Sequence, residues 1–238
     1  MVFLGRLTSE IPFAKVSKYL LMSEPINVKI ENEAVPHRMH GDERRRQLID
    51  VAMQVFATHG YRGTTTREIA KVAGISEAII FRHFQNKEEL YSAILDEKSR
   101  DRVIPETFSK LAKFVVEKDD FGFFYTLAIS ILDNQQNDED FLRLMLHSAL
   151  EGHEMADAFF EKLVLEVYGF VGEYIRERQG DGVFVDMEPR VIARSFLGTI
   201  IHHSMNNLLW DRRRKILRIS NEDAAREFTE LLLSGIRK

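Results

Sequence analysis

The residue types that usually carry out chemistry are sparse in this chain of 238 residues. There is no cysteine, which excludes thiolate nucleophiles, cysteine-bound metals and disulfides. Ser148 stands beside His147 and near Glu151, but adjacent residues of a helix point apart, so these three do not form a catalytic triad. No glycine-rich phosphate loop is present either. We therefore expect no enzymatic activity and no cofactor.

Histidines of the second half of the chain are the remaining candidates for metal ligands, at positions 147, 153, 202 and 203. Their separations within each pair are six residues and one residue. Neither separation places two imidazoles on one helix face, as spacings of three or four would. We expect no metal site, and we interpret these residues as buried histidines with polar partners.

Positive charge, in contrast, collects in one segment. Between Gly41 and Lys87 there are eight Arg or Lys residues against five Asp or Glu residues, although the whole chain has a net charge of −4. A local excess of this kind suits phosphate groups, because neutralised phosphates release their counterions. The segment is therefore predicted to bind nucleic acid.

These cations must be positioned by helices. Capping residues in the sequence indicate where each helix begins. Residues 44–59 have one wide apolar face, and a glycine follows them. Thr65 and Glu68 fit a capping box that opens a second, short helix. Ser76 and Asn86 are placed to cap two further helices.

The two middle helices have the spacing of a helix-turn-helix. Ala70 is small where the two helices would touch, and Gly74 tolerates the positive φ that the turn needs. Ile75 and Ile80 are apolar where the second helix would meet the core. The alternative is that this segment is a small helical subdomain whose charges only contact solvent. That alternative does not explain why Ala70, Gly74, Ile75 and Ile80 have the spacing of a helix-turn-helix.

This segment resembles the DNA-binding domain of the TetR family of bacterial transcriptional regulators. The resemblance is carried by residues 58–90, THGYRGTTTREIAKVAGISEAIIFRHFQNKEEL. The shared pattern is a glycine, the threonine run, Ile-Ala, Ala-Gly-Ile-Ser, an aromatic-x-x-Phe, and a lysine before an acidic helix start. The resemblance implies an all-helical homodimer that binds a double-stranded DNA operator. It also implies that a small molecule bound to the C-terminal domain usually ends repression.

Two positions depart from the family pattern: Ile79 stands where threonine is common, and Phe81 stands where tyrosine is common. We interpret Ile79 as a contact for a thymine methyl group and Phe81 as a packing residue. Lys87 is placed at a helix N-terminus, where the helix dipole also favours phosphate. We assign base reading to Glu77, Ala78 and Arg82. The alternative is that these side chains are only exposed to solvent and contact no base. The predicted DNA-binding residues are Arg45, Thr65, Thr66, Ser76, Glu77, Ala78, Ile79, Arg82, His83 and Lys87.

Helical spacing dominates the chain and strand alternation is nearly absent, so we expect an all-α protein. We divide it into a poorly ordered extension (1–40), a helix-turn-helix DNA-binding domain (41–90) and a helical ligand-binding and dimerisation domain (91–238). No run of eighteen apolar residues occurs, so we expect no membrane span and a cytoplasmic location.

The third segment is rich in phenylalanine and has no basic residue between Phe121 and Phe141. A strongly anionic ligand would lack cationic partners there, so we expect a largely apolar effector. Core packing is the alternative for these side chains. The predicted pocket residues are Phe123, Leu127, Phe141, Leu144 and Phe159.

Two long helices, expected at about 154–179 and 189–211, have apolar residues on two faces and so must be buried on two sides. One side would meet the same chain and the other a second subunit. The predicted dimer interface consists of Tyr168, Phe196, Leu197, Ile200 and Ser204. Two functions remain open: a ligand-responsive regulator, acting as a repressor, and a constitutive DNA-binding protein whose C-terminal half only dimerises.

Overall fold

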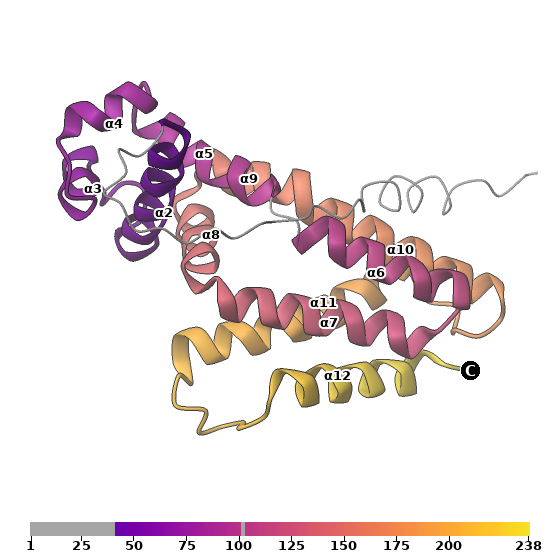
Figure 1. Cartoon of the computed structure of the whole chain (residues 1–238). Helices are drawn as coiled ribbons and strands as arrows, with labels where there is room; N and C mark the ends of the chain where they lie inside the picture. The colour runs from indigo at the N-terminus through magenta and orange to yellow at the C-terminus, as the bar shows by residue number, and fades with distance from the viewer. Residues whose placement is uncertain (1–40, 101–102) are drawn as a thin grey trace, which may run out of the picture.

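The computed structural model describes residues 41–100 and 103–238, and these residues form helices joined by short connections (Figure 1). Outside the helices, the only β pairing in the described residues is one isolated bridge between Phe184 and Arg237. The prediction of an all-α protein is confirmed. The expected extension at 1–40 lies outside the described residues. In the part that the structure describes, no helix is long and apolar enough to cross a membrane.

Helices at one end of the molecule form the N-terminal unit: α2 (Gly41–His59), α3 (Thr66–Val72), α4 (Glu77–His83) and α5 (Lys87–Arg100). Their caps largely follow the sequence. Gly60 ends α2 with φ +71°, and the Asn86 side chain accepts a 2.8 Å hydrogen bond from the Glu89 backbone N–H at the start of α5. Apolar side chains of these helices meet in what we call the first core, which includes Leu48, Phe56, Ile69, Ile80 and Tyr91, all fully buried.

The helices that follow are α6 (Val103–Glu117), α7 (Asp120–Asn137), α8 (Glu139–Glu151), α9 (Glu154–Phe159), α10 (Leu165–Gly180), α11 (Pro189–Met205) and α12 (Asn221–Ile236). Most of them run nearly alongside one another over much of the molecule, whereas α8 lies across this direction (Figure 1). The helices α6, α7, α10, α11 and α12 enclose a second core, built around Phe123, Phe124, Val171, Tyr174 and Ile200.

The two predicted long helices are present, but each contains a π-helical stretch that the sequence did not indicate. The π-helix η1 (Phe160–Val164) joins α9 to α10, and η2 (Asn206–Trp210) extends α11. Such stretches widen the helix locally and are frequent at functional sites.

A buried polar cluster fixes α7 to α10 inside the second core. The Tyr174 hydroxyl and the Arg178 Nε each donate a 2.7 Å hydrogen bond to Asp120 Oδ1, and Arg178 Nη1 donates to Asp181 at 2.6 Å. The hydrogen bonds to Asp120 raise the pKa of Arg178, and burial raises the pKa of Tyr174. The Arg178 guanidinium therefore keeps its charge, and the Tyr174 hydroxyl keeps its proton, at ordinary pH values.

The helices α8 and α9 contribute to the first core rather than to the second. Leu144 and Met145 from α8, and Met155 from α9, are buried among the side chains of α2 and α5 in the first core. Figure 1 shows α8 lying directly beside α2. The N-terminal unit is therefore completed by a helix from the C-terminal half of the chain.

Candidate nucleic-acid interface and ligand cavity

The turn between α3 and α4 has the geometry that the sequence predicted. The Thr65 side chain caps α3 by accepting a hydrogen bond from the Glu68 backbone N–H at 3.2 Å. Gly74 has φ +66° and its N–H bonds to Lys71 O at 3.2 Å, while the N–H of the next residue, Ile75, bonds to Ala70 O at 3.0 Å. These two bonds form a Schellman motif, which needs a residue that accepts positive φ.

A side-chain hydrogen bond holds α3 and α4 at a fixed angle. Thr66 Oγ1 donates a hydrogen bond to Glu77 Oε1 at 2.5 Å across the turn. Two residues that were predicted to contact DNA therefore bind each other. Ser76 has the extended backbone of an N-cap residue, but its side chain makes no capping hydrogen bond, contrary to prediction. The Ile79 backbone N–H bonds to Ser76 O instead. The Ser76 side chain is exposed.

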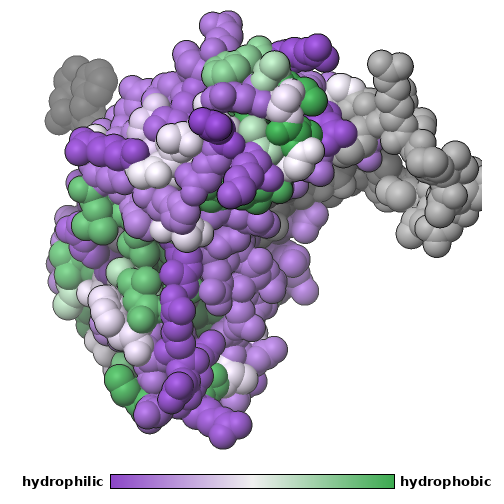
Figure 2. All heavy atoms as spheres, turned by 90° about the vertical axis from the view of Figure 1, so that its left-hand side faces the viewer, coloured by the Kyte–Doolittle hydropathy of each residue, from purple (hydrophilic) through white to green (hydrophobic). Residues whose placement is uncertain are grey.

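The outer face of α4 consists of Ala78, Phe81 and Arg82, which are exposed, while Ile80 points into the first core. Ile79 and His83 are half-buried at the edges of this face. Phe81 is 49% exposed, so its interpretation as a packing residue was wrong. Figure 2 looks onto this end of the molecule, where the surface is mostly hydrophilic with scattered apolar side chains.

Lys87 has intramolecular partners that the sequence did not indicate. Its Nζ donates to Tyr61 O at 2.8 Å and to Thr64 O at 2.9 Å, and it lies 4.0 Å from the centre of the Tyr61 ring. Lys87 thereby fixes the turn between α2 and α3. A phosphate contact by Lys87 stays a prediction. If it forms, the Lys87 ammonium would bind the phosphate in addition to these two carbonyl oxygens. The guanidinium of Arg45, another predicted phosphate contact, lies 4.8 Å from the centre of the Phe84 ring.

The same turn contacts the connection between α8 and α9, residues 151–153, which we call the α8–α9 junction. The Arg62 backbone N–H donates to Glu151 Oε2 at 3.3 Å, and Arg62 Nη2 donates to Glu151 O at 3.3 Å. His153 Nε2 lies 3.2 Å from Glu88 Oε1, and its ring centre lies 4.4 Å from that of Tyr61. The junction therefore connects the C-terminal half directly to the turn that precedes α3.

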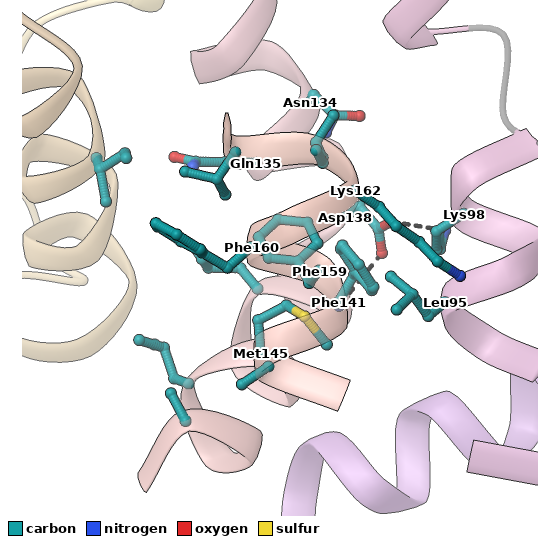
Figure 3. A pocket seen from close by; sticks show the side chains of 17 residues that line it. Leu95, Lys98, Asn134, Gln135, Asp138, Phe141, Met145, Phe159, Phe160 and Lys162 are labelled. Atoms are coloured by element: carbon teal, nitrogen blue, oxygen red, sulfur yellow. Dashed lines mark hydrogen bonds and ion pairs between the residues drawn. The ribbon is translucent and has the colours of Figure 1, made fainter. Parts of the chain in front are cut away.

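A cavity of about 410 Å³ lies between α5, α7, α8, the α9–η1 stretch and α11 (Figure 3). Phe141 and Phe159 line it, as predicted. Phe123 and Leu127 lie in the second core and Leu144 in the first, so these three do not line it. The lining also includes residues that were not predicted, among them Leu95, Lys98, Gln135, Asp138, Met145, Phe160 and Lys162.

One wall of the cavity is also part of the first core. Leu95 and Met145 are buried members of that core, and Phe141 and Phe159 pack against it. A molecule in the cavity would therefore touch side chains whose other surfaces support α2 and α5.

The predicted dimer contacts Phe196, Leu197 and Ile200 are buried in the second core of the protomer itself. A side chain without exposed surface cannot meet a partner, so these three are removed from the interface. Tyr168 and Ser204 are half-buried. The exposed face of α11 is formed instead by residues such as Val191, Ser195, Gly198, Thr199 and His202.

The capped α3, the Schellman turn and the exposed face of α4 define a helix-turn-helix protein, a class in which the second helix reads the major groove. Residues 48–94 match the family model described as "Bacterial regulatory proteins, tetR family". The N-terminal domain of this chain is therefore a TetR-family DNA-binding domain.

Two relatives from Bacillus subtilis (strain 168) and one solved structure illustrate the similarity. The chain is 44% identical over 70 residues to the uncharacterized HTH-type transcriptional regulator YvkB, a match that covers 29% of this chain and 37% of YvkB. It is 25% identical over 191 residues to the fatty acid metabolism regulator protein, covering 80% and 94% of the two chains. The fatty acid degradation regulator FadR from Bacillus halodurans has a similar fold, with a TM-score of 0.63, 24% identity, and 81% and 99% of the two chains covered. The stronger sequence match to YvkB therefore spans little more than a third of that protein.

Proposed function

We propose that this protein represses transcription by binding an operator as a homodimer, and that a small, largely apolar effector in the cavity releases it from DNA. The observation that carries this proposal is the shared wall, because Leu95, Phe141, Met145 and Phe159 line the cavity and also pack in the first core. The cavity volume of about 410 Å³ falls in the range of roughly 300–1,000 Å³ that is usual for small-molecule sites. The names of the Bacillus relatives favour an effector derived from fatty acids.

DNA recognition would fall to the exposed face of α4. Ala78, Phe81 and Arg82 are free to enter a major groove, whereas Thr66 and Glu77 fix the angle between the two helices. Arg82 carries the charge at the outer face and is the strongest candidate for reading a guanine.

The DNA part of the proposal is tested by selecting binding sites from random duplexes and footprinting the best one. Two-fold symmetric protection is expected. Arg82→Ala should weaken binding to that site by about 1–3 kcal/mol and relax the preference at one position in each half-site. Arg190→Ala removes the same charge from a side chain that is 83% exposed at the start of α11, and it should leave operator binding unchanged. Equal losses for both variants would show a general charge effect and contradict base reading by Arg82.

Dimerisation would use the exposed face of α11, where Ser195, Gly198 and Thr199 leave room for close helix packing. Thr199→Arg should give monomers that retain the helical circular-dichroism spectrum, as measured by sedimentation. Thr58→Arg, at an exposed position of α2, should remain dimeric. An unchanged dimer for Thr199→Arg would place the interface elsewhere.

A constitutive DNA-binding protein is the second candidate function, and the cavity argues against it. Ala156 lines the cavity and is half-buried, so Ala156→Trp should fill part of the space. If Ala156→Trp blocks the release of DNA by apolar compounds while operator affinity is kept, the ligand-responsive function is supported. If no apolar compound changes the operator affinity of the natural protein, the constitutive function is favoured.

A further inference from the structure

The polar groups of the cavity differ in whether they already have partners. Lys98 Nζ lies 2.6 Å from Asp138 Oδ2, and Lys162 Nζ lies 3.4 Å from Asp96 Oδ1. Both lysines of the lining are therefore already paired with carboxylates. An anionic ligand would have to compete with Asp138 for Lys98, and displacing Asp138 would leave a partly buried carboxylate in the cavity wall, which is unfavourable. Asp96, the partner of Lys162, is exposed and does not line the cavity.

Gln135 on α7 is different, because its Oε1 is buried and has no hydrogen-bond partner. An unsatisfied buried acceptor costs on the order of 1–3 kcal/mol, so one that borders a cavity needs an explanation. Figure 3 shows Gln135 on the side of the cavity away from Lys98 and Leu95. The amide thus lies at the opposite end from the charged pair.

The surroundings of Gln135 also change in polarity along the cavity. Met145, Phe159 and Phe160 provide an apolar stretch on one side. On the other side, Gln135 borders a second hollow of about 40 Å³, whose lining includes Glu139, Ser204, Asn207 and Arg214. A ligand with one polar end would therefore be oriented with that end at Gln135 and its hydrocarbon part among the aromatic residues.

We propose that the effector is an uncharged, elongated amphiphile with one hydrogen-bond donor, such as a long-chain alcohol, and that the Gln135 amide, whose Oε1 is buried in the empty cavity, turns toward the ligand to accept this hydrogen bond. This inference rests on the proposed function, since it specifies the chemistry of the molecule that the same cavity takes. A carboxylate has no proton to donate at neutral pH and would place its own lone pairs against Oε1. An ester of equal length has only acceptors, so it too would leave Oε1 without a partner.

The test compares three probes of matched length, 1-decanol, decanoate and methyl nonanoate, by isothermal titration of the full-length protein. We expect 1-decanol to bind at least roughly threefold more tightly than the ester, the lower range of one net hydrogen bond, and decanoate to bind most weakly. In Gln135→Leu, which keeps the side-chain volume, 1-decanol should lose roughly three- to tenfold in affinity while the ester is unaffected. Asn137→Leu, at an exposed position near the end of α7, is the matched control and should behave as the natural protein.

The inference would be overturned by tighter binding of decanoate than of 1-decanol, by equal losses for alcohol and ester in Gln135→Leu, or by no binding of any probe. An unchanged alcohol affinity in Gln135→Leu would also overturn it, because a water molecule would then suffice as the partner of Oε1. Operator binding is measured beside each titration. If decanoate binds best and releases DNA, the regulatory function stands and only the inference fails. If 1-decanol binds as expected without changing operator affinity, the inference stands and the proposed function fails.

Discussion

Replacing Gly60 by alanine should weaken the contact between the turn after α2 and the α8–α9 junction. Gly60 has φ +71°, where an L-residue costs roughly 1–2 kcal/mol. A Cβ built at this position would also collide with Glu151 Oε1 and would lie 3.3 Å from His147 Nδ1. Because the obstructing atom is the end of a flexible side chain, Glu151 can swing away and relieve the collision.

The cost of that movement can be estimated from what Glu151 would lose. Its Oε2 accepts a 3.3 Å hydrogen bond from the Arg62 backbone N–H, and a bond of this length at an exposed site is worth about 0.5–1 kcal/mol. Gly60→Ala should therefore destabilise the protein by about 1.5–3 kcal/mol in total. Gly74→Ala is the matched control, since Gly74 has φ +66° and a Cβ there would meet nothing within 4 Å. Gly74→Ala should therefore cost only the roughly 1–2 kcal/mol that arises from the positive φ.

The assay is urea denaturation followed by circular dichroism, in the natural background and in Glu151→Ala. The collision and the hydrogen bond both disappear in Glu151→Ala, so the cost of Gly60→Ala should fall there by about 0.5–1 kcal/mol, toward that of Gly74→Ala. If Gly60→Ala costs the same in both backgrounds, Glu151 does not contact this turn in solution, and the described junction is wrong.

Three other substitutions test the polar contacts. Lys87→Met removes hydrogen bonds from a charged donor to two carbonyls, so it should destabilise the protein by about 2–3 kcal/mol in urea denaturation. A salt slope of DNA binding that is lower by about one unit in this variant would confirm the predicted phosphate contact, and an unchanged slope would contradict it. Asp120→Asn leaves the buried Arg178 short of a charge partner and should cost about 3 kcal/mol, whereas a loss below about 1 kcal/mol would mean that the cluster is hydrated. Burial lowers the pKa of His203, helped by the charges of neighbouring groups, so the unfolded chain binds a proton more readily and stability should fall as pH drops below about 6.5. His203→Gln should flatten this part of the stability profile, and an unchanged slope between pH 7 and 5 would contradict the assignment.

Local rules made the helix-turn-helix predictable from the sequence. Thr65 caps α3 and Gly74 ends it because both effects depend on a few residues that are adjacent in the chain. Ile80 enters the core because the spacing from Gly74 fixes which side of a short helix faces inward. Such features do not require knowledge of what the rest of the chain packs against.

Packing partners were not predictable in the same way. The apolar spacing of Leu197 and Ile200 correctly indicated burial, but it could not distinguish the core of the same protomer from a partner subunit. The same limit applies to the cavity: Phe123 and Phe141 look alike in sequence, and only the tertiary arrangement places the first in the core and the second in the cavity wall. For Lys87, the helix-dipole argument pointed to phosphate, while two backbone carbonyls brought close by the fold are nearer partners.

The position of α8 sets a condition on how large the effector response can be. This helix of 13 residues carries Met145 in the shared wall and ends at Glu151 in the junction, within about two turns of each other, so both move together when the helix tilts. To lower operator affinity a hundredfold, the effector must bind the DNA-released state about 2.7 kcal/mol more tightly than it binds the DNA-binding state. Each hydrogen bond of Arg62 to Glu151 is worth about 1 kcal/mol at most. A response of that size therefore requires the shared wall and the junction to change together, and a variant that breaks only the Arg62 contacts should retain part of the response.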